Sequence, residues 1–130
     1  MNPLLEMKNI SKRFPGVMAL ADVDFGIGRG EVVALAGENG AGKSTLMKIL
    51  GGVYAPDAGS VLINGGEVFI KSVADAIGAG IAFVHQELNV FDNLTIAENV
   101  YLGREPLIAG FLVKRNKLNA DTEVYLKRLG

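Results

Sequence analysis

The chain has 130 residues, 49% of them hydrophobic and 21% charged, so it can bury one core and is unlike a disordered protein. It has no cysteine and one histidine, which excludes a disulfide framework and a zinc cluster of several cysteines or histidines. No apolar run approaches the ~20 residues that a membrane-spanning helix needs, and charged residues interrupt the first ten positions. We therefore expect a cytoplasmic globular protein.

The net charge of −1 is unevenly spread. Residues 1–103 hold 7 Lys/Arg against 11 Asp/Glu, which gives −4, and residues 104–130 hold 6 against 3, which gives +3. A basic tail can indicate nucleic-acid binding. Because acidic residues are interspersed here, a solvated helical face is the better interpretation, and we expect no nucleic-acid partner.

Short strands are predicted in the first third of the chain. Residues 4–10 and 22–27 have strand-like spacing, and a turn follows at 28–30. Residues 31–36 (EVVALA) end in five consecutive apolar residues, which predicts a strand buried on both faces, as in a parallel sheet covered by helices. Residues 44–50 then have helical spacing.

The middle of the chain predicts a hairpin, a short helix and a further strand. Asn64-Gly65 separates two apolar stretches within residues 60–70, and both residues tolerate positive φ, which indicates a hairpin. A helix over 72–79 and a strand over 81–84 are expected to follow.

The last third predicts two helices. Thr95 and Glu98 fit a capping box, so a helix should begin at Thr95 and end near Gly103. Asn119 is expected to cap a last helix that runs toward the C-terminus. The overall pattern is α/β, with an antiparallel β portion early and helices late.

Residues 37–44 (GENGAGKS) carry the strongest chemical signal. Gly37, Gly42, Lys43 and Ser44 satisfy the pattern G-x-x-x-x-G-K-[ST], which a shuffled chain of this composition would match by chance in roughly 0.7% of cases. The loop also lies between a predicted strand and a predicted helix, as phosphate sites require. A glycine-rich turn that happens to precede a lysine is the alternative.

The residue types fit phosphate chemistry. Glycines allow successive backbone N–H groups to point at an anion, and the helix N-terminus adds free donors and a positive dipole end. Lys43 can reach the β- and γ-phosphates of ATP, and the Ser44 hydroxyl can bind Mg²⁺. The predicted nucleotide contacts in the loop are Gly37, Asn39, Gly40, Gly42, Lys43 and Ser44.

Two or three strands precede the loop, and residues 12–65 (KRFPGV…SVLING) resemble the nucleotide-binding domain of ABC transporters. Residues 83–105 (FVHQELNVFDNLTIAENVYLGRE) resemble the branch that imports ribose, galactose and other monosaccharides. The resemblance implies a P-loop NTPase core over 1–103 and the start of a helical subdomain over 104–130. It also implies an incomplete domain, the N-terminal portion of a longer protein.

The resemblance assigns roles to three further residues. Phe14 takes the position of an aromatic that stacks on adenine, with an ordinary core phenylalanine as the alternative. Gln86 takes the position of a catalytic glutamine that contacts the metal and the attacking water. Thr45 is implied as a contact to the β-phosphate or the metal side.

Neighbouring residues have less definite roles. His85 does not match the family's hydrolysis histidine, and a structural role is the better interpretation for it. Glu87 is expected to be a surface or hinge residue. Residues 91–99 correspond to the surface that receives the permease, although burial within the helical subdomain is an equal interpretation.

Three family elements have no match in these 130 residues: the LSGGQ-type signature, an apolar strand ending in Asp-Glu, and a later switch histidine. The resemblance implies a transport ATPase on the inner face of the membrane. Its partners would be permease subunits, a second nucleotide-binding domain and, indirectly, a periplasmic or extracellular sugar-binding protein. For the present chain we expect nucleotide binding without hydrolysis.

Two alternative functions stay open. A soluble ABC protein of translation or DNA repair has the same fold, and a non-catalytic nucleotide-binding module would need no hydrolysis. An apolar strand at 31–36 without neighbours could also cause self-association, which light scattering would detect.

Overall fold

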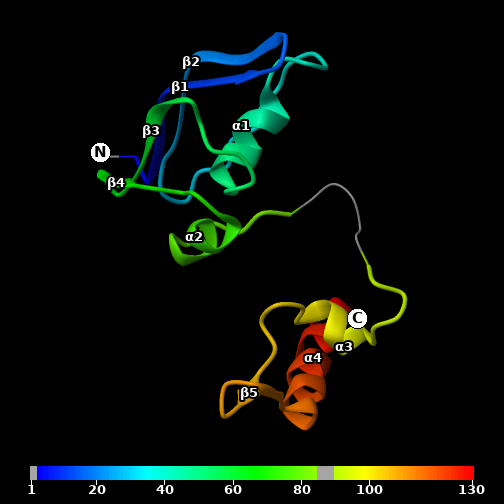
Figure 1. Ribbon diagram of the computed structural model, residues 1–130. Helices are drawn as coiled ribbons and strands as arrows, with labels where there is room; N and C mark the ends of the chain where they lie inside the picture. Colours follow the sequence, from blue (N-terminus) through cyan, green and yellow to red (C-terminus); the bar gives the residue numbers. More distant parts are fainter. Residues whose placement is uncertain (1–2, 85–89) are drawn as a thin grey trace. The chain divides into compact units, whose positions relative to one another are not determined.

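The computed structural model describes residues 3–84 and 90–130 (Figure 1). The chain divides into two compact units, 1–84 and 85–130, and each is described by itself. The predicted boundary at residue 103 stays a prediction. Over the described ranges, no helix has both the length and the apolar character needed to cross a bilayer.

A four-stranded antiparallel sheet forms the framework of the first unit. Its strands are β1 (Leu5–Phe14), β2 (Val17–Ile27), β3 (Ala58–Ile63) and β4 (Gly66–Val68), in the spatial order β2-β1-β3-β4. The strands predicted at 4–10 and 22–27 are present, although β1 and β2 are longer than their patterns indicated. The predicted antiparallel β portion is confirmed.

The turn between β3 and β4 lies where the sequence places it. Asn64 and Gly65 have φ angles of 53° and 80°, and Ile63 pairs with Gly66 across the turn. Two positive φ angles in a two-residue loop match the right-handed twist of the flanking strands. The hairpin prediction is therefore confirmed.

Two helices complete the first unit. Helix α1 (Lys43–Leu50) contributes Leu46 and Ile49 to a core shared with the sheet, and helix α2 (Val73–Gly78) contributes Ala76. The Ser72 side chain caps α2 by accepting a hydrogen bond from the Asp75 N–H. Met7, Ile10 and Ile49 are the largest fully buried side chains. Burial of each stabilises the fold by roughly 1.5–3 kcal/mol, so the core holds α1 against the sheet.

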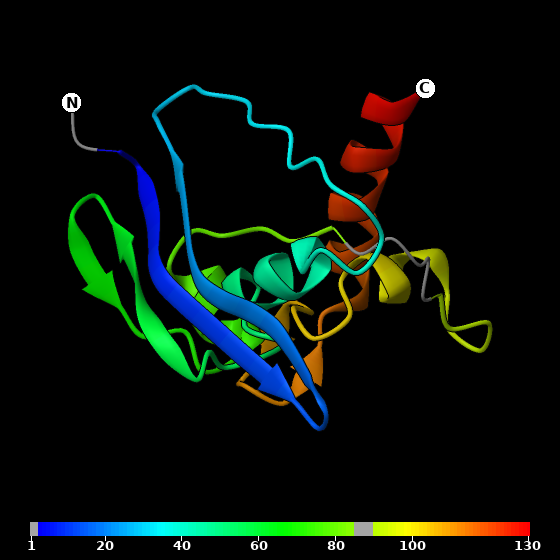
Figure 2. The same ribbon diagram turned by 90° about the horizontal axis from the view of Figure 1, so that it is seen from above.

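Two predicted strands are absent, at residues 31–36 and 81–84. Figure 2 shows the stretch from the end of β2 to α1 as a long open arc, and Val32 and Val84 are 96% and 92% exposed. A strand exists through hydrogen bonds to a neighbouring strand, and no strand in the described ranges pairs with either stretch. The apolar pattern indicates a preference for burial, but it does not show whether a neighbouring strand is available to pair with.

The second unit contains α3 (Ile96–Val100), α4 (Arg115–Leu129) and a short hairpin of β5 (Leu107–Ile108) and β6 (Leu112–Val113). Helices α3 and α4 pack together, and Ala97, Leu118 and Thr122 are buried. The sequence did not predict the hairpin. Its strands are only two residues long, which is too short for a periodic pattern.

The predicted cap at Asn119 is wrong. Helix α4 begins four residues earlier, at Arg115, so Asn119 lies inside the helix. The Leu118 N–H already donates to the Lys114 carbonyl, and Leu118 is 2% exposed. Packing of Leu118 and Thr122 fixes the helix here and overrides the weak preference of asparagine for a cap.

The capping box of α3 is confirmed. The Glu98 N–H donates to the Thr95 hydroxyl oxygen at 3.3 Å, and the Thr95 N–H donates to the Glu98 carboxylate at 2.8 Å. The hydrogen bond from the Thr95 N–H, followed by that from its hydroxyl, holds the pKa of Glu98 below its ordinary value. The carboxylate form of Glu98 is therefore the form that stabilises α3.

This capping box predicts an acid transition in α3. A lowered folded pKa gives stability that is complete above the ordinary value of 4.5 and is lost as the pH falls through the folded pKa. Glutamine can still bond back to Thr95 but does not titrate in this range. The Cα chemical shifts of residues 96–100 should move toward coil values on acidification in the native chain and stay level in Glu98→Gln. Equal acid transitions in both proteins would contradict this assignment.

Candidate functional site

The glycine-rich loop ends at the N-terminus of α1, where donors are available to a ligand. Gly42 is the N-cap residue, and no side chain caps the helix. The first hydrogen bond of α1 runs from the Leu46 N–H to the Gly42 carbonyl at 2.9 Å. Within the described part of the chain, the N–H groups of residues 43–45 donate to no acceptor. Such donors, at the positive end of a helix dipole, form an anion-binding position.

Lys43 folds back over the loop. Its ammonium donates to the carbonyl oxygens of Gly37, at 2.7 Å, and Glu38, at 2.6 Å. Its side chain is half-buried, and none of the ion pairs found between described residues involves it. The positive charge is thus held inside the loop by neutral oxygens, which the charged oxygens of a phosphate can replace.

Gly42 anchors the loop against the sheet. Its φ angle is +82°, and a Cβ added there would lie 2.6 Å from both the Ala19 carbonyl oxygen and the Leu20 side chain. Leu20 lies in the core on β2, so it has no room to move aside. Only glycine allows the loop to pass this close to β2, which fixes where α1 begins.

The remaining predicted loop contacts lie along the same segment. Gly37, Asn39 and Gly40 are exposed, Ser44 is exposed, and Thr45 is half-buried in the first turn of α1. Across the described residues, no group of three or more His, Cys, Asp or Glu could hold a metal ion. The Mg²⁺ contact of the Ser44 hydroxyl stays a prediction.

Phe14 ends β1 and lies in a cluster that the sequence did not reveal. Its ring meets the ring of Tyr54 edge-on, with centroids 5.2 Å apart and an interplanar angle of 71°. The Lys12 ammonium lies 5.8 Å from the Phe14 centroid and donates to Asp57 at 2.8 Å. That hydrogen bond, followed by one from the Arg13 N–H, lowers the pKa of Asp57. Phe14 is half-buried, so the role in adenine stacking stays a prediction.

The predicted glutamine Gln86 lies outside the described residues, as do His85 and Glu87. Its assigned contacts with metal and water stay predictions.

The segment 91–99 is organised by a residue that sequence reasoning missed. The Asn99 side chain accepts from the Phe91 N–H at 2.8 Å and donates to the carbonyls of Phe91, Leu94 and Thr95. The sequence signal that could have identified Asn99 is its position four residues after Thr95, which lets its side chain reach the Thr95 carbonyl. Phe91 is 49% exposed and Ile96 67%, so apolar surface is available there, and the docking role stays a prediction.

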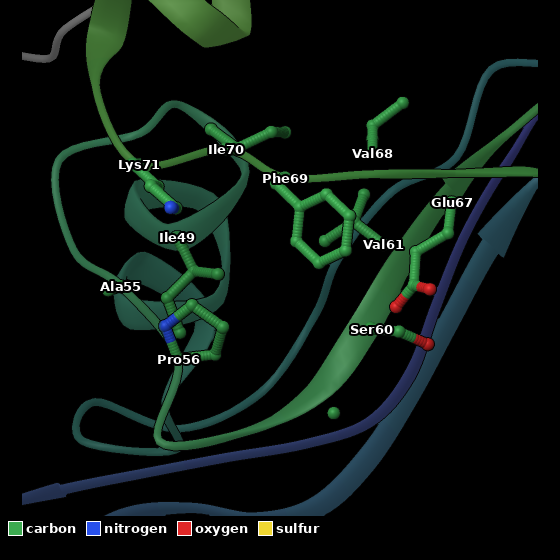
Figure 3. A pocket seen from close by; sticks show the side chains of 11 residues that line it. Ile49, Ala55, Pro56, Ser60, Val61, Glu67, Val68, Phe69, Ile70 and Lys71 are labelled. Carbon is green, nitrogen blue, oxygen red and sulfur yellow. The ribbon is translucent and has the colours of Figure 1, made fainter.

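A separate pocket of ≈ 190 Å³ lies between α1, β3 and β4 (Figure 3). Ile49, Val61 and Phe69 form much of its apolar wall, with Lys71 and Glu67 also lining it. None of residues 37–45 lines this pocket. Its volume is below the roughly 300–1,000 Å³ of ligand pockets.

The loop, the uncapped helix and the inward-folded lysine define a protein of the P-loop class, built on an antiparallel sheet. Within that class the chain belongs to the ABC transporter family, whose sequence model matches residues 20–130. The predicted fold class is therefore confirmed.

Curated relatives match nearly the whole chain. Ribose import ATP-binding protein RbsA 2 of Streptomyces coelicolor is 53% identical over 127 residues, which are 98% of this chain and 24% of that protein. Ribose import ATP-binding protein RbsA 1 of Rubrobacter xylanophilus is 52% identical over 130 residues, with 100% and 26% covered. Arabinose import ATP-binding protein AraG of Escherichia coli O6:H1 is 50% identical over 128 residues, with 98% and 25% covered. The chain thus spans about a quarter of the length of these relatives.

Solved structures show the same fold. A nucleotide-free ATP-binding cassette from an ABC transporter has a TM-score of 0.70 at 28% identity, covering 92% of this chain and 46% of the other. The ADP conformation of the ATP-binding cassette MJ1267 has a TM-score of 0.58 at 31% identity, covering 62% and 32%.

Proposed function

We propose that this chain is the ATP-binding part of an ABC ATPase that energises monosaccharide uptake. The observation that carries the proposal is the arrangement around Lys43. Its ammonium lies inside the loop on two carbonyl oxygens, next to N–H groups of residues 43–45 that have no acceptor among the described residues. The Lys43 ammonium can exchange the carbonyl oxygens for phosphate oxygens, and the backbone N–H groups can donate to the same phosphates.

Each predicted contact has a place in this proposal. Gly37, Asn39, Gly40 and Gly42 provide the loop backbone, Lys43 the charge, and Ser44 the hydroxyl for Mg²⁺. Thr45 adds a second hydroxyl on the first turn of α1. Phe14 stacks on the adenine, and Gln86 contacts the metal and the attacking water.

The names of the relatives support sugar import, since those compared are called ribose or arabinose import ATP-binding proteins. We extend this to monosaccharide uptake for the whole protein, which would act at the cytoplasmic face of the membrane. Its partners would be permease subunits, a second nucleotide-binding domain and, indirectly, a sugar-binding protein. Residues 91–99, with Phe91 exposed, would form part of the surface that receives the permease.

The 130-residue chain should bind MgATP without turnover. Phosphoryl transfer to water needs charge stabilisation, a positioned metal and an oriented nucleophile together. The loop supplies the first, and Ser44 only part of the second. Phosphate release by the chain should therefore equal that of a Lys43→Ala control, while ATP binding is measurable by calorimetry. Phosphate release above that control would contradict the proposal.

A non-catalytic nucleotide-binding module is the second candidate. It is favoured by the sequence, in which no Asp-Glu pair follows an apolar strand. The same pair of measurements separates it from an enzyme only when made on a longer chain. Binding with no turnover, in a chain extended to the full length of the relatives, would favour the module.

A further inference from the structure

The hairpin of β5 and β6 presents a continuous apolar surface. Residues 106–113 (PLIAGFLV) contain no charged side chain. All five large apolar side chains of the two strands and their loop are exposed, with Phe111 at 74% and Leu112 at 55%. Figure 1 shows the hairpin beside the first turns of α4. A contiguous exposed apolar surface of this kind is typical of a site that contacts a membrane or another protein.

Both faces of this hairpin leave apolar side chains partly exposed. A strand that covers a core alternates apolar side chains toward the core with polar ones toward water. Here Leu107 pairs with Val113 and Ile108 with Leu112, so both faces of the hairpin are apolar. By contrast, β3 in the other unit buries Val61 at 5% exposure. The exposed part of these side chains, largest at Phe111, is therefore available to an apolar environment outside the chain.

Positive charge surrounds the apolar tip. Residues 104–117 contain Arg104, Lys114, Arg115 and Lys117 but only one acidic residue, Glu105. All four cationic side chains are exposed. Lys117 pairs with Asp121 at 3.0 Å, while Arg104 and Lys114 have no ion pair with any described residue. Apolar side chains flanked by exposed cations are complementary to an anionic bilayer, which has acyl chains below negative headgroups.

We propose that the β5–β6 hairpin inserts into the interface of an anionic lipid membrane. Phe111 and Leu112 enter the boundary of headgroups and acyl chains, and Arg104, Lys114 and Arg115 contact the phosphates. Eight uncharged residues are far fewer than the ~20 that span a bilayer, so the hairpin lies in the interface and does not cross it. The proposal does not depend on nucleotide binding.

The chain contains no tryptophan, so a single introduced indole reports on one position. Phe111→Trp places it at the hairpin, and Phe69→Trp is a matched control because Phe69 is also 74% exposed, in the other unit. Both variants of the full 130-residue chain are titrated with phosphatidylglycerol vesicles and with phosphatidylcholine vesicles. We expect a blue shift of Phe111→Trp emission with phosphatidylglycerol, little shift with phosphatidylcholine, and none for Phe69→Trp.

A second pair of variants tests the charges. Lys114→Gln should weaken binding to phosphatidylglycerol vesicles roughly fivefold, whereas Lys71→Gln, with the same change in net charge, should have little effect. Three results would overturn the proposal. They are no shift of Phe111→Trp with either lipid, an equal shift of Phe69→Trp, or a Phe111→Trp shift that rises with protein concentration without vesicles. The last result would assign the hairpin to contact between two copies of the chain.

Discussion

Replacing Lys43 with alanine should weaken ATP binding roughly 10- to 150-fold. The Lys43 ammonium is held by the carbonyl oxygens of Gly37 and Glu38, and it can exchange these for the β- and γ-phosphate oxygens. A hydrogen bond to a charged group contributes about 1.5–3 kcal/mol, which sets the range of the loss. Because the Lys43 ammonium bonds, among the described residues, only to carbonyls of the exposed loop, the free energy of unfolding should change little. Isothermal titration with MgATP measures the affinity directly.

Lys48→Ala is the matched control for this result. Lys48 lies on the same helix, but its ammonium lies 5.7 Å from the Tyr54 ring centroid and not in the loop. Its removal changes the net charge equally and should leave ATP affinity within about twofold, since a charge that makes no direct contact with the phosphates is screened by solvent and salt. Equal losses for the two variants would mean that Lys43 acts only through the general charge of the chain.

Gly42→Ala should strongly destabilise the first unit. The added Cβ would meet the Ala19 carbonyl oxygen and the Leu20 side chain at 2.6 Å, and φ at this position is +82°. Overpacking and left-handed backbone strain each cost about 1–3 kcal/mol, so we expect a loss of about 3 kcal/mol in the free energy of unfolding. ATP affinity should fall with it, because the loop must move away from β2. Urea unfolding and nucleotide titration measure the two effects.

Gly40→Ala separates backbone strain from steric overlap. Gly40 has a similar φ of +87°, but a Cβ there would have no atom within 4 Å. Only the strain remains, so the loss should be about 1 kcal/mol. If Gly42→Ala were no more destabilising than Gly40→Ala, the close approach of the loop to β2 would not exist in solution.

Local signals predicted the elements that are held by local interactions. The hairpin at Asn64-Gly65 follows from positive φ in two adjacent residues, and the start of α3 follows from the capping box of Thr95 and Glu98. Each depends on residues at most three positions apart. Sequence spacing therefore carried all the information that those elements require.

Elements that depend on distant partners could not be predicted in the same way. The apolar run at 31–36 predicted a buried strand, yet a strand needs hydrogen bonds from neighbours that the pattern does not contain. The start of α4 was misplaced because the burial of Leu118 outweighs the capping preference of Asn119.

In the candidate site too, the features formed by neighbouring residues were predicted and those formed by distant residues were not. The spacing of Gly42 and Lys43 predicted the loop and the helix that follows it, because the motif is contiguous. The return of the Lys43 ammonium to Gly37 and the contact of Phe14 with Tyr54 were not foreseen. The Phe14–Tyr54 contact joins residues forty positions apart, and only the fold brings them together.

A titration of the isotope-labelled chain with MgATP, followed through its backbone amide resonances, tests the central claim most directly. The donors at the start of α1, which have no acceptor among the described residues, should bind the phosphates. We expect the largest shifts at residues 40 and 42–45, and about 10- to 150-fold weaker binding when Lys43 is alanine. Shifts that leave residues 40–45 unchanged, or that are identical in the Lys43→Ala variant, would contradict the assignment of this loop as the nucleotide site.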